Sequence, residues 1–159
     1  MRIAIYLDLL TRGEEVLAAS YRKVAEGHGD EPDVHELCLV LAGQCDAHVR
    51  ALEPFGERYG EGEADDEPER LHADVLGTAR TGPLGLIRDL QDLHLLATLA
   101  QTSWTAVGQA AQALRDVELN ETVSRCGEQI LTQLGWLQTR LKQAAPQALA
   151  VGFDGLEVG

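Results

Sequence analysis

Apolar residues recur every three or four positions along four long stretches of the chain, which is the spacing of helices that bury one face. Breaks rich in glycine, proline or acidic residues separate these stretches. Few β-branched or aromatic runs are available for strands, so we predict an all-α fold. The four predicted helices are Ile3–Glu26, Asp33–Tyr59, Pro83–Leu114 and Val117–Ala145.

The lengths of the connections indicate how the helices pack. The turn at 28–32 and the connection at Arg115–Asp116 are short, so each predicts a pair of antiparallel neighbours. The second connection is long enough to cross the bundle diagonal or end. We therefore predict an antiparallel four-helix bundle over residues 1–145, followed by a loosely ordered C-terminal tail at 146–159.

Three local features add detail to this prediction. Asp33, followed three residues later by Glu36, has the spacing of a helix N-cap. Pro54 lies inside the second helix and should kink or end it. A short helix near Glu69–Thr78 is expected in the long connection, after the acidic stretch Gly60–Pro68, which is either a partner surface or a solvated linker.

Composition and charge narrow the function. The 159 residues are 45% hydrophobic and carry a formal net charge of −13. That charge disfavours nucleic acid and anionic membranes as partners and leaves a basic protein partner open. The sequence contains no stretch of about 18 apolar residues, so it predicts no membrane-spanning helix. We expect a soluble homo-oligomer.

The three cysteines, Cys38, Cys45 and Cys126, are odd in number and widely spaced, which argues against a disulfide framework. The first residues lack the pattern of a signal peptide. A reducing, cytoplasmic location follows as an expectation, and each cysteine is interpreted first as a small core residue.

Polar residues interrupt the apolar stripes of the first two helices. Glu14 lies about sixteen residues before the turn at 28–32, and Cys45 and His48 lie about fifteen to eighteen after it. At 1.5 Å per residue they fall at one height in the bundle. A carboxylate, a thiol and an imidazole are therefore expected to converge in the core.

This convergence leaves three alternatives. A buried Glu14–His48 pair with a purely structural role is favoured, because a buried carboxylate must be neutralised, paired or metal-bound. Partial exposure of Glu14 and a metal or ligand site are the others. The candidate ligands are Glu14, Cys45, His48, His94 and Cys126.

The second helix pair offers fewer candidates. His94 is offset from the apolar stripe, and the middle of the pair carries Thr98, Gln101, Gln129 and Gln133, which hydrogen-bond but are poor metal ligands. Other polar residues are interpreted as surface residues. They are His28, His35, His72, Asp89, Asp92 and Glu128.

The carboxylate on the first helix and the histidine on the second resemble the ferritin-like superfamily, which includes rubrerythrin and small stress-associated bundles. That family places Glu on helices one and three and Glu-x-x-His on helices two and four. Here the matching elements are Cys45-Asp46-Ala47-His48 and Cys126-Gly127-Glu128-Gln129. By residue type, Glu14 and His48 alone match. The resemblance implies a ferritin-like bundle with an altered or absent di-iron site.

Two functions follow as hypotheses. The first is a non-catalytic structural or interaction module that has lost metal chemistry. The second is a metal-binding or redox protein that uses Glu14 and His48, with iron or another transition metal as cofactor. An apolar-ligand carrier is a third alternative. The absence of a bound metal is the favoured expectation.

Overall fold

The computed structural model describes residues 2–60, 74–78 and 80–151. In these ranges the chain forms four long helices and no strand, which confirms the predicted all-α, four-helix architecture for the described residues. The elements are α1 (Ile3–Gly27), α2 (Pro32–Tyr59), α3 (Gly82–Ala113), α4 (Val117–Pro146) and a short π-helix, η2 (Gln147–Val151).

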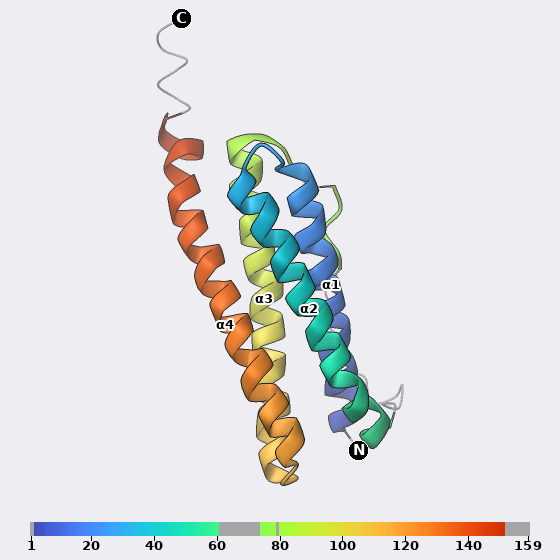
Figure 1. The fold of residues 1–159 in the computed structure, drawn as a ribbon. Helices are drawn as coiled ribbons and strands as arrows, with labels where there is room; N and C mark the ends of the chain where they lie inside the picture. The colour runs from blue at the N-terminus through green and yellow to red at the C-terminus, as the bar shows by residue number, and fades with distance from the viewer. Residues whose placement is uncertain (1, 61–73, 79, 152–159) are drawn as a thin grey trace, which may run out of the picture.

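The helices pack side by side along their lengths (Figure 1). α1 packs against α2 and α3, and α4 packs against α3 and lies more loosely beside α2. Figure 1 shows that α2 and α3 run in the same direction, because the connection between them returns the chain to the opposite end of the bundle. Each helix consequently runs opposite to the two helices beside it.

One continuous apolar core occupies the space between the helices. It is built largely of leucine, alanine and valine, as the low aromatic content requires. The largest fully buried side chains are Trp104 and Tyr21. Both are amphipathic, and a buried indole N–H or phenol O–H normally finds a hydrogen-bond partner. These two residues therefore bring polar atoms into the core.

The predicted N-cap of α2 is wrong. The helix begins at Pro32, a residue suited to the first turn because it lacks an N–H group, and Glu31 rather than Asp33 precedes it without a side-chain cap. Asp33 instead receives a 2.7 Å hydrogen bond from Arg140. The helix also continues past Pro54 to its end. Pro54 is exposed, so water can solvate the carbonyl group that its missing N–H leaves unbonded.

Polar bridges join the loosely packed helices α2 and α4 at both ends. Asp116, the N-cap of α4, accepts hydrogen bonds from Leu119 N–H, Arg58 and Tyr59. At the other end Arg140 bonds Glu31 as well as Asp33. Two bridges near the middle of the helices, described below, complete this contact.

Part of the long connection lies against α1. Leu76 N–H donates to Ser20 Oγ at 3.2 Å, and Lys23 Nζ donates to the carbonyl oxygen of Gly77 at 2.9 Å. The helix expected near Glu69–Thr78 is not formed at 74–78, and its first part, like most of the acidic stretch Gly60–Pro68, lies outside the described residues. In the described ranges no helix has the length and apolarity needed to cross a bilayer.

Candidate functional site

A buried carboxylate in the middle of the bundle gathers polar groups from other helices. Glu14 on α1 has no exposed surface. Its Oε1 atom accepts a 3.0 Å hydrogen bond from His48 Nδ1 on α2 and a 2.8 Å bond from Trp104 Nε1 on α3. The convergence of Glu14 and His48 predicted from their heights is thereby confirmed. The indole donor from α3 was not predicted.

The surroundings of His48 favour its protonated form. Its second ring nitrogen, Nε2, lies 2.7 Å from Oε1 of Gln129 on α4, so both nitrogens face acceptors and each donates a proton. Burial by itself lowers the pKa of His48. The hydrogen bond and negative charge of Glu14, together with the bond to Gln129, outweigh that effect and the repulsion from Arg125, and raise the pKa above its ordinary value. Glu14 therefore favours the imidazolium form of His48.

A second polar layer lies beside this pair. Gln133 on α4 is fully buried and accepts a 2.9 Å bond from the Tyr21 hydroxyl through Oε1, while its Nε2 donates to Gln44 Oε1 at 3.1 Å. The Cys45 sulfur lies 4.0 Å from Gln133 Oε1. All four helices consequently contribute to one polar cluster, which we call the core cluster: Glu14, Tyr21, Gln44, Cys45, His48, Trp104, Gln129 and Gln133.

The cysteine of the core cluster is held in its thiol form. Burial raises the pKa of Cys45 far above its ordinary value, and the neighbouring Glu14 carboxylate raises it further. Burial likewise raises the pKa of Cys38 to about 12 and that of Cys126 to about 11. Since the thiolate is the nucleophile and the metal ligand, these environments oppose both roles. All three cysteines are buried and free, as core residues were expected to be.

One atom of the core cluster has no hydrogen-bond partner among the described residues. Glu14 Oε2 is buried and receives no hydrogen bond from any described residue. A carboxylate oxygen without a donor in a water-excluded site is costly, so the atom is suited to a proton, a water molecule or a cation.

The five predicted ligands do not come together as one set. Glu14, Cys45 and His48 are neighbours, and Cys126 is buried near enough to feel the charge of Glu14. His94 is ten residues before Trp104, about 15 Å along α3, and its Nδ1 lies 3.5 Å from Thr98 Oγ1 on its own helix.

Among the described residues no group of three or more His, Cys, Asp or Glu side chains is placed to hold a metal ion. The arrangement also departs from the family's di-iron pattern, because a tryptophan rather than a glutamate of α3 reaches Glu14. The residues as placed do not fit a di-iron centre. A metal site that uses some of them stays a prediction.

A second buried pair contradicts the surface interpretation of His28 and Asp89. Both are 1% exposed, and His28 Nε2 donates to Asp89 Oδ2 at 2.7 Å. The backbone N–H of Arg80 donates to the same oxygen at 3.0 Å, and the Arg80 guanidinium donates to Oδ1 at 2.9 Å and to Asp92. This end cluster joins the end of α1, the connection before α3 and the first turns of α3.

The sequence carried a signal for the end cluster. The apolar stripe of α1 continues by four residues from Val24 to His28, and Asp89 stands three residues after Leu86 and four before Leu93 in the stripe of α3. Both residues therefore occupy inward positions. The surface interpretation failed because it gave proximity to a turn more weight than position on the stripe.

Comparison with known proteins does not identify a relative. No protein-family model matches the chain, and neither a search of curated proteins nor a search of solved structures finds a match. The function therefore has to be argued from the geometry of the two buried clusters and of the surface.

Proposed function

We propose that this chain is a ferritin-like helical scaffold without the family's di-iron chemistry, and that it acts in the cytoplasm as a non-catalytic structural or interaction module. The observation that carries the proposal is that the polar groups of the core hydrogen-bond to one another. Glu14 Oε1 takes two donors, and both nitrogens of His48 are engaged by protein side chains. Groups used in this way hold four helices in register rather than bind a substrate.

The remaining chemistry of the core cluster agrees with a structural role. The thiol of Cys45 is kept protonated by burial and by the neighbouring Glu14, which raise its pKa. The strongly acidic surface keeps such a module soluble and suits it to a basic partner. Neither feature requires a reaction.

A specific observation supports one competing function. Glu14 Oε2 is a buried oxygen without a donor, and a metal ion or a proton would satisfy it. A metal-binding protein that used Glu14 and His48 would have to release His48 from Glu14 or from Gln129. The competing proposal is therefore a mononuclear site formed by rearrangement.

Metal analysis separates the two proposals. The protein, purified without a metal-binding tag, is analysed for metals and then titrated with Fe(II) and Zn(II) by calorimetry, alongside Glu14→Gln, Glu14→Ala/His48→Ala and the control Glu15→Gln. Glu15 is the exposed neighbour of Glu14, so its substitution removes the same charge from the surface. We expect less than about 0.1 equivalent of metal and no saturable binding in any of the four proteins.

Stoichiometric metal that depends on Glu14 would be the opposite result. One equivalent of metal in the parent protein and in Glu15→Gln, lost in Glu14→Gln, would overturn the non-catalytic proposal and support the mononuclear site. Glu14→Gln preserves the size of the side chain, so this loss would not be a consequence of unfolding. Circular dichroism of each variant checks that the helices are intact.

A further inference from the structure

The side of α2 that faces away from the core carries an unusual sequence. Residues spaced by three and four positions along it are all exposed, and they form a straight stripe opposite the buried one. Leu39 and Val40 on this stripe are 46% and 56% exposed. We call the stripe the α2 outer face; its residues are Glu36, Leu39, Val40, Gly43, Ala47 and Arg50.

The glycine at the centre of the α2 outer face is not required by packing against the described residues. Glycine is the poorest helix former apart from proline, and it is tolerated where another backbone approaches closely. A Cβ atom added at Gly43 would meet no atom of the described residues within 4 Å. The internal packing therefore gives no reason for glycine here, and a close approach from outside the chain does.

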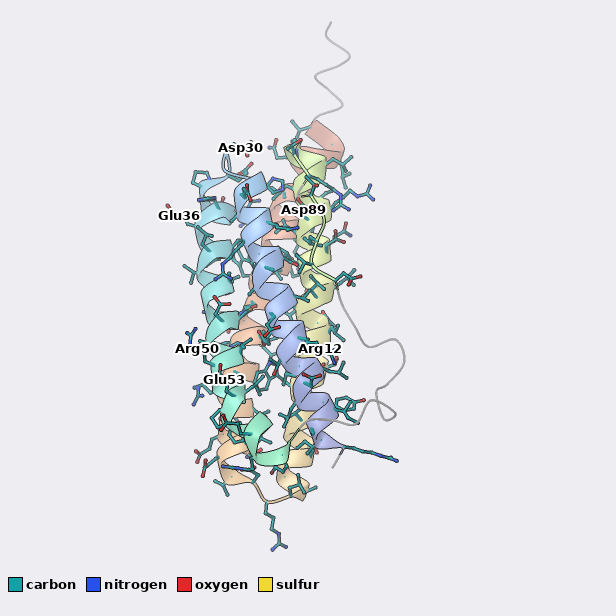
Figure 2. All side chains as sticks on the ribbon, turned by 90° about the vertical axis from the view of Figure 1, so that its right-hand side faces the viewer. Arg12, Asp30, Glu36, Arg50, Glu53 and Asp89 are labelled. Carbon is teal, nitrogen blue, oxygen red and sulfur yellow. The ribbon has the colours of Figure 1, made fainter. Side chains whose placement is uncertain are left out.

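The charges at the two ends of the α2 outer face have no partner in the part of the chain that the structure describes. Neither Glu36 nor Arg50 makes an ion pair or hydrogen bond with any residue in the described ranges. The other exposed arginines of α1 and α2, together with Arg80 of the connection, bind acids, as Arg22 binds Asp46 and Arg58 binds Asp116. Figure 2 shows Glu36 and Arg50 on the same outer side of α2. They have opposite signs, and the exposed positions continue beyond them to Asp33, which binds Arg140, and to Glu53.

We propose that the α2 outer face binds a second copy of this chain through an antiparallel pairing of the two α2 helices. Glu36 and Arg50 each lie seven residues from Gly43. A two-fold axis through Gly43 therefore sets Glu36 of each copy opposite Arg50 of the other, and gives two symmetric ion pairs.

The same axis matches the side chains between the charges. Gly43 meets Gly43 at the crossing point, where the absence of side chains lets the two helices approach. The large side chain of Leu39 in each copy then lies opposite the small Ala47 of the other, because each is four residues from Gly43. Val40 lies opposite Asp46, which binds Arg22 of its own chain. A face that is self-complementary in both charge and size is the requirement of a two-fold interface.

The pairing rests on the proposed function in one respect, since it names the partner surface of the interaction module. The stripe between Glu36 and Arg50 carries one acid and one base, so the net charge of −13 is not concentrated at the contact. One helix pair gives a small interface. Interfaces below about 1,200 Å² form weak, transient complexes, so we expect a dissociation constant in the micromolar range.

Sedimentation velocity of the full chain tests the proposal from about 5 µM to about 500 µM, which brackets such affinities. We expect the mass to rise towards that of a dimer. Gly43→Leu should weaken association by about ten-fold or more, because its side chain separates the helices. Gly135→Leu is the matched control, since Gly135 on α4 is also exposed with no atom near its Cβ position.

Reversing the charges of Glu36 and Arg50 tests the same dimer independently. Glu36→Arg and Arg50→Glu each set like charges across the axis, and should each weaken the dimer by about ten-fold, while the double variant restores opposite charges and should recover most of the affinity. Circular dichroism and thermal melting check folding, and Gly43→Leu should melt no lower than the parent protein.

Three results would overturn the proposal. They are a parent chain that stays monomeric throughout, a dimer that Gly43→Leu and Gly135→Leu affect equally, and a double charge variant no better than the single ones. Bound metal at Glu14 with a normal dimer would overturn the proposed function alone. A metal-free protein without the dimer would overturn this inference alone.

Discussion

The bundle contains two buried histidine–carboxylate pairs, and they differ in how the carboxylate is used. In the end cluster both oxygens of Asp89 accept hydrogen bonds, from His28 and from two groups of Arg80. In the core cluster Oε1 of Glu14 accepts two bonds and Oε2 accepts none from the described residues. Asp89 therefore accepts hydrogen bonds through both of its oxygens, whereas Glu14 accepts them through one oxygen.

The difference follows from position. Asp89 lies at the end of the bundle, where Figure 2 shows it on α3, and a half-exposed arginine from the connection can reach it there. Glu14 lies in the middle, where only helix side chains are available and a long cation would have to be buried. The end cluster therefore joins chain segments, whereas the core cluster keeps one oxygen open.

The largest effect on stability is expected when the His28–Asp89 pair of the end cluster is broken. Asp89→Asn replaces an acceptor oxygen by an NH₂ group that must face His28 or Arg80, both donors. Loss of one partner of a buried pair costs about 3–5 kcal/mol, and the remaining oxygen recovers part of it, so we expect the free energy of unfolding to fall by about 2–4 kcal/mol. Urea denaturation at pH 7 measures this.

The control for that prediction is the corresponding amide in the core cluster. Glu14→Gln keeps an oxygen for His48 and Trp104 and places its NH₂ group where Oε2 had no donor, so we expect a loss below about 1 kcal/mol. Equal losses in the two variants would show that the open oxygen of Glu14 is satisfied in solution, and the contrast between the clusters would fail.

The sequence predicted the core cluster better than the end cluster for a physical reason. Glu14 and His48 interrupt long apolar stripes, and the short turn between their helices fixes their relative height. Those two facts suffice to bring them together. The bond from Trp104 to Glu14 depends on how α1 packs against α3, which no short connection fixes.

The end cluster depends on a segment whose path the sequence does not determine. Arg80 reaches Asp89 only because the connection before α3 passes the end of α1, and long connections without periodicity carry no signal for such a path. The helices themselves were predicted to within one residue at each end, because stripes and turn residues are local features.

The pH dependence of stability gives a second, smaller expected difference between the parent protein and Glu14→Gln. The pKa of His48 is raised in the folded chain above the usual 6.5, so protonation stabilises the fold below that pH, and this contribution is lost as the pH rises through the higher folded value. Each unit of difference corresponds to about 1.4 kcal/mol. We expect the parent protein to lose stability across this window relative to Glu14→Gln.

Urea denaturation between about pH 5.5 and about pH 8.5 gives that difference, a range chosen around the usual histidine pKa. Asp89→Asn is the control, because it leaves the core cluster intact and should keep the pH dependence that His48 contributes. Parallel profiles for the parent protein and Glu14→Gln would show that Glu14 does not favour the imidazolium form of His48.

The smallest effect concerns the outer contact of His48. Gln129→Leu removes the acceptor of the His48 Nε2–H bond. Gln129 is exposed, so water can take its place, and we expect a loss of only about 0.5–1 kcal/mol together with a lower pKa of His48. NMR titration of the imidazole measures the pKa, and Gln138→Leu, also exposed on α4, controls for an added surface leucine. If the His48 pKa is the same in both variants, Gln129 does not support the imidazolium, and the charge of His48 depends on Glu14 alone.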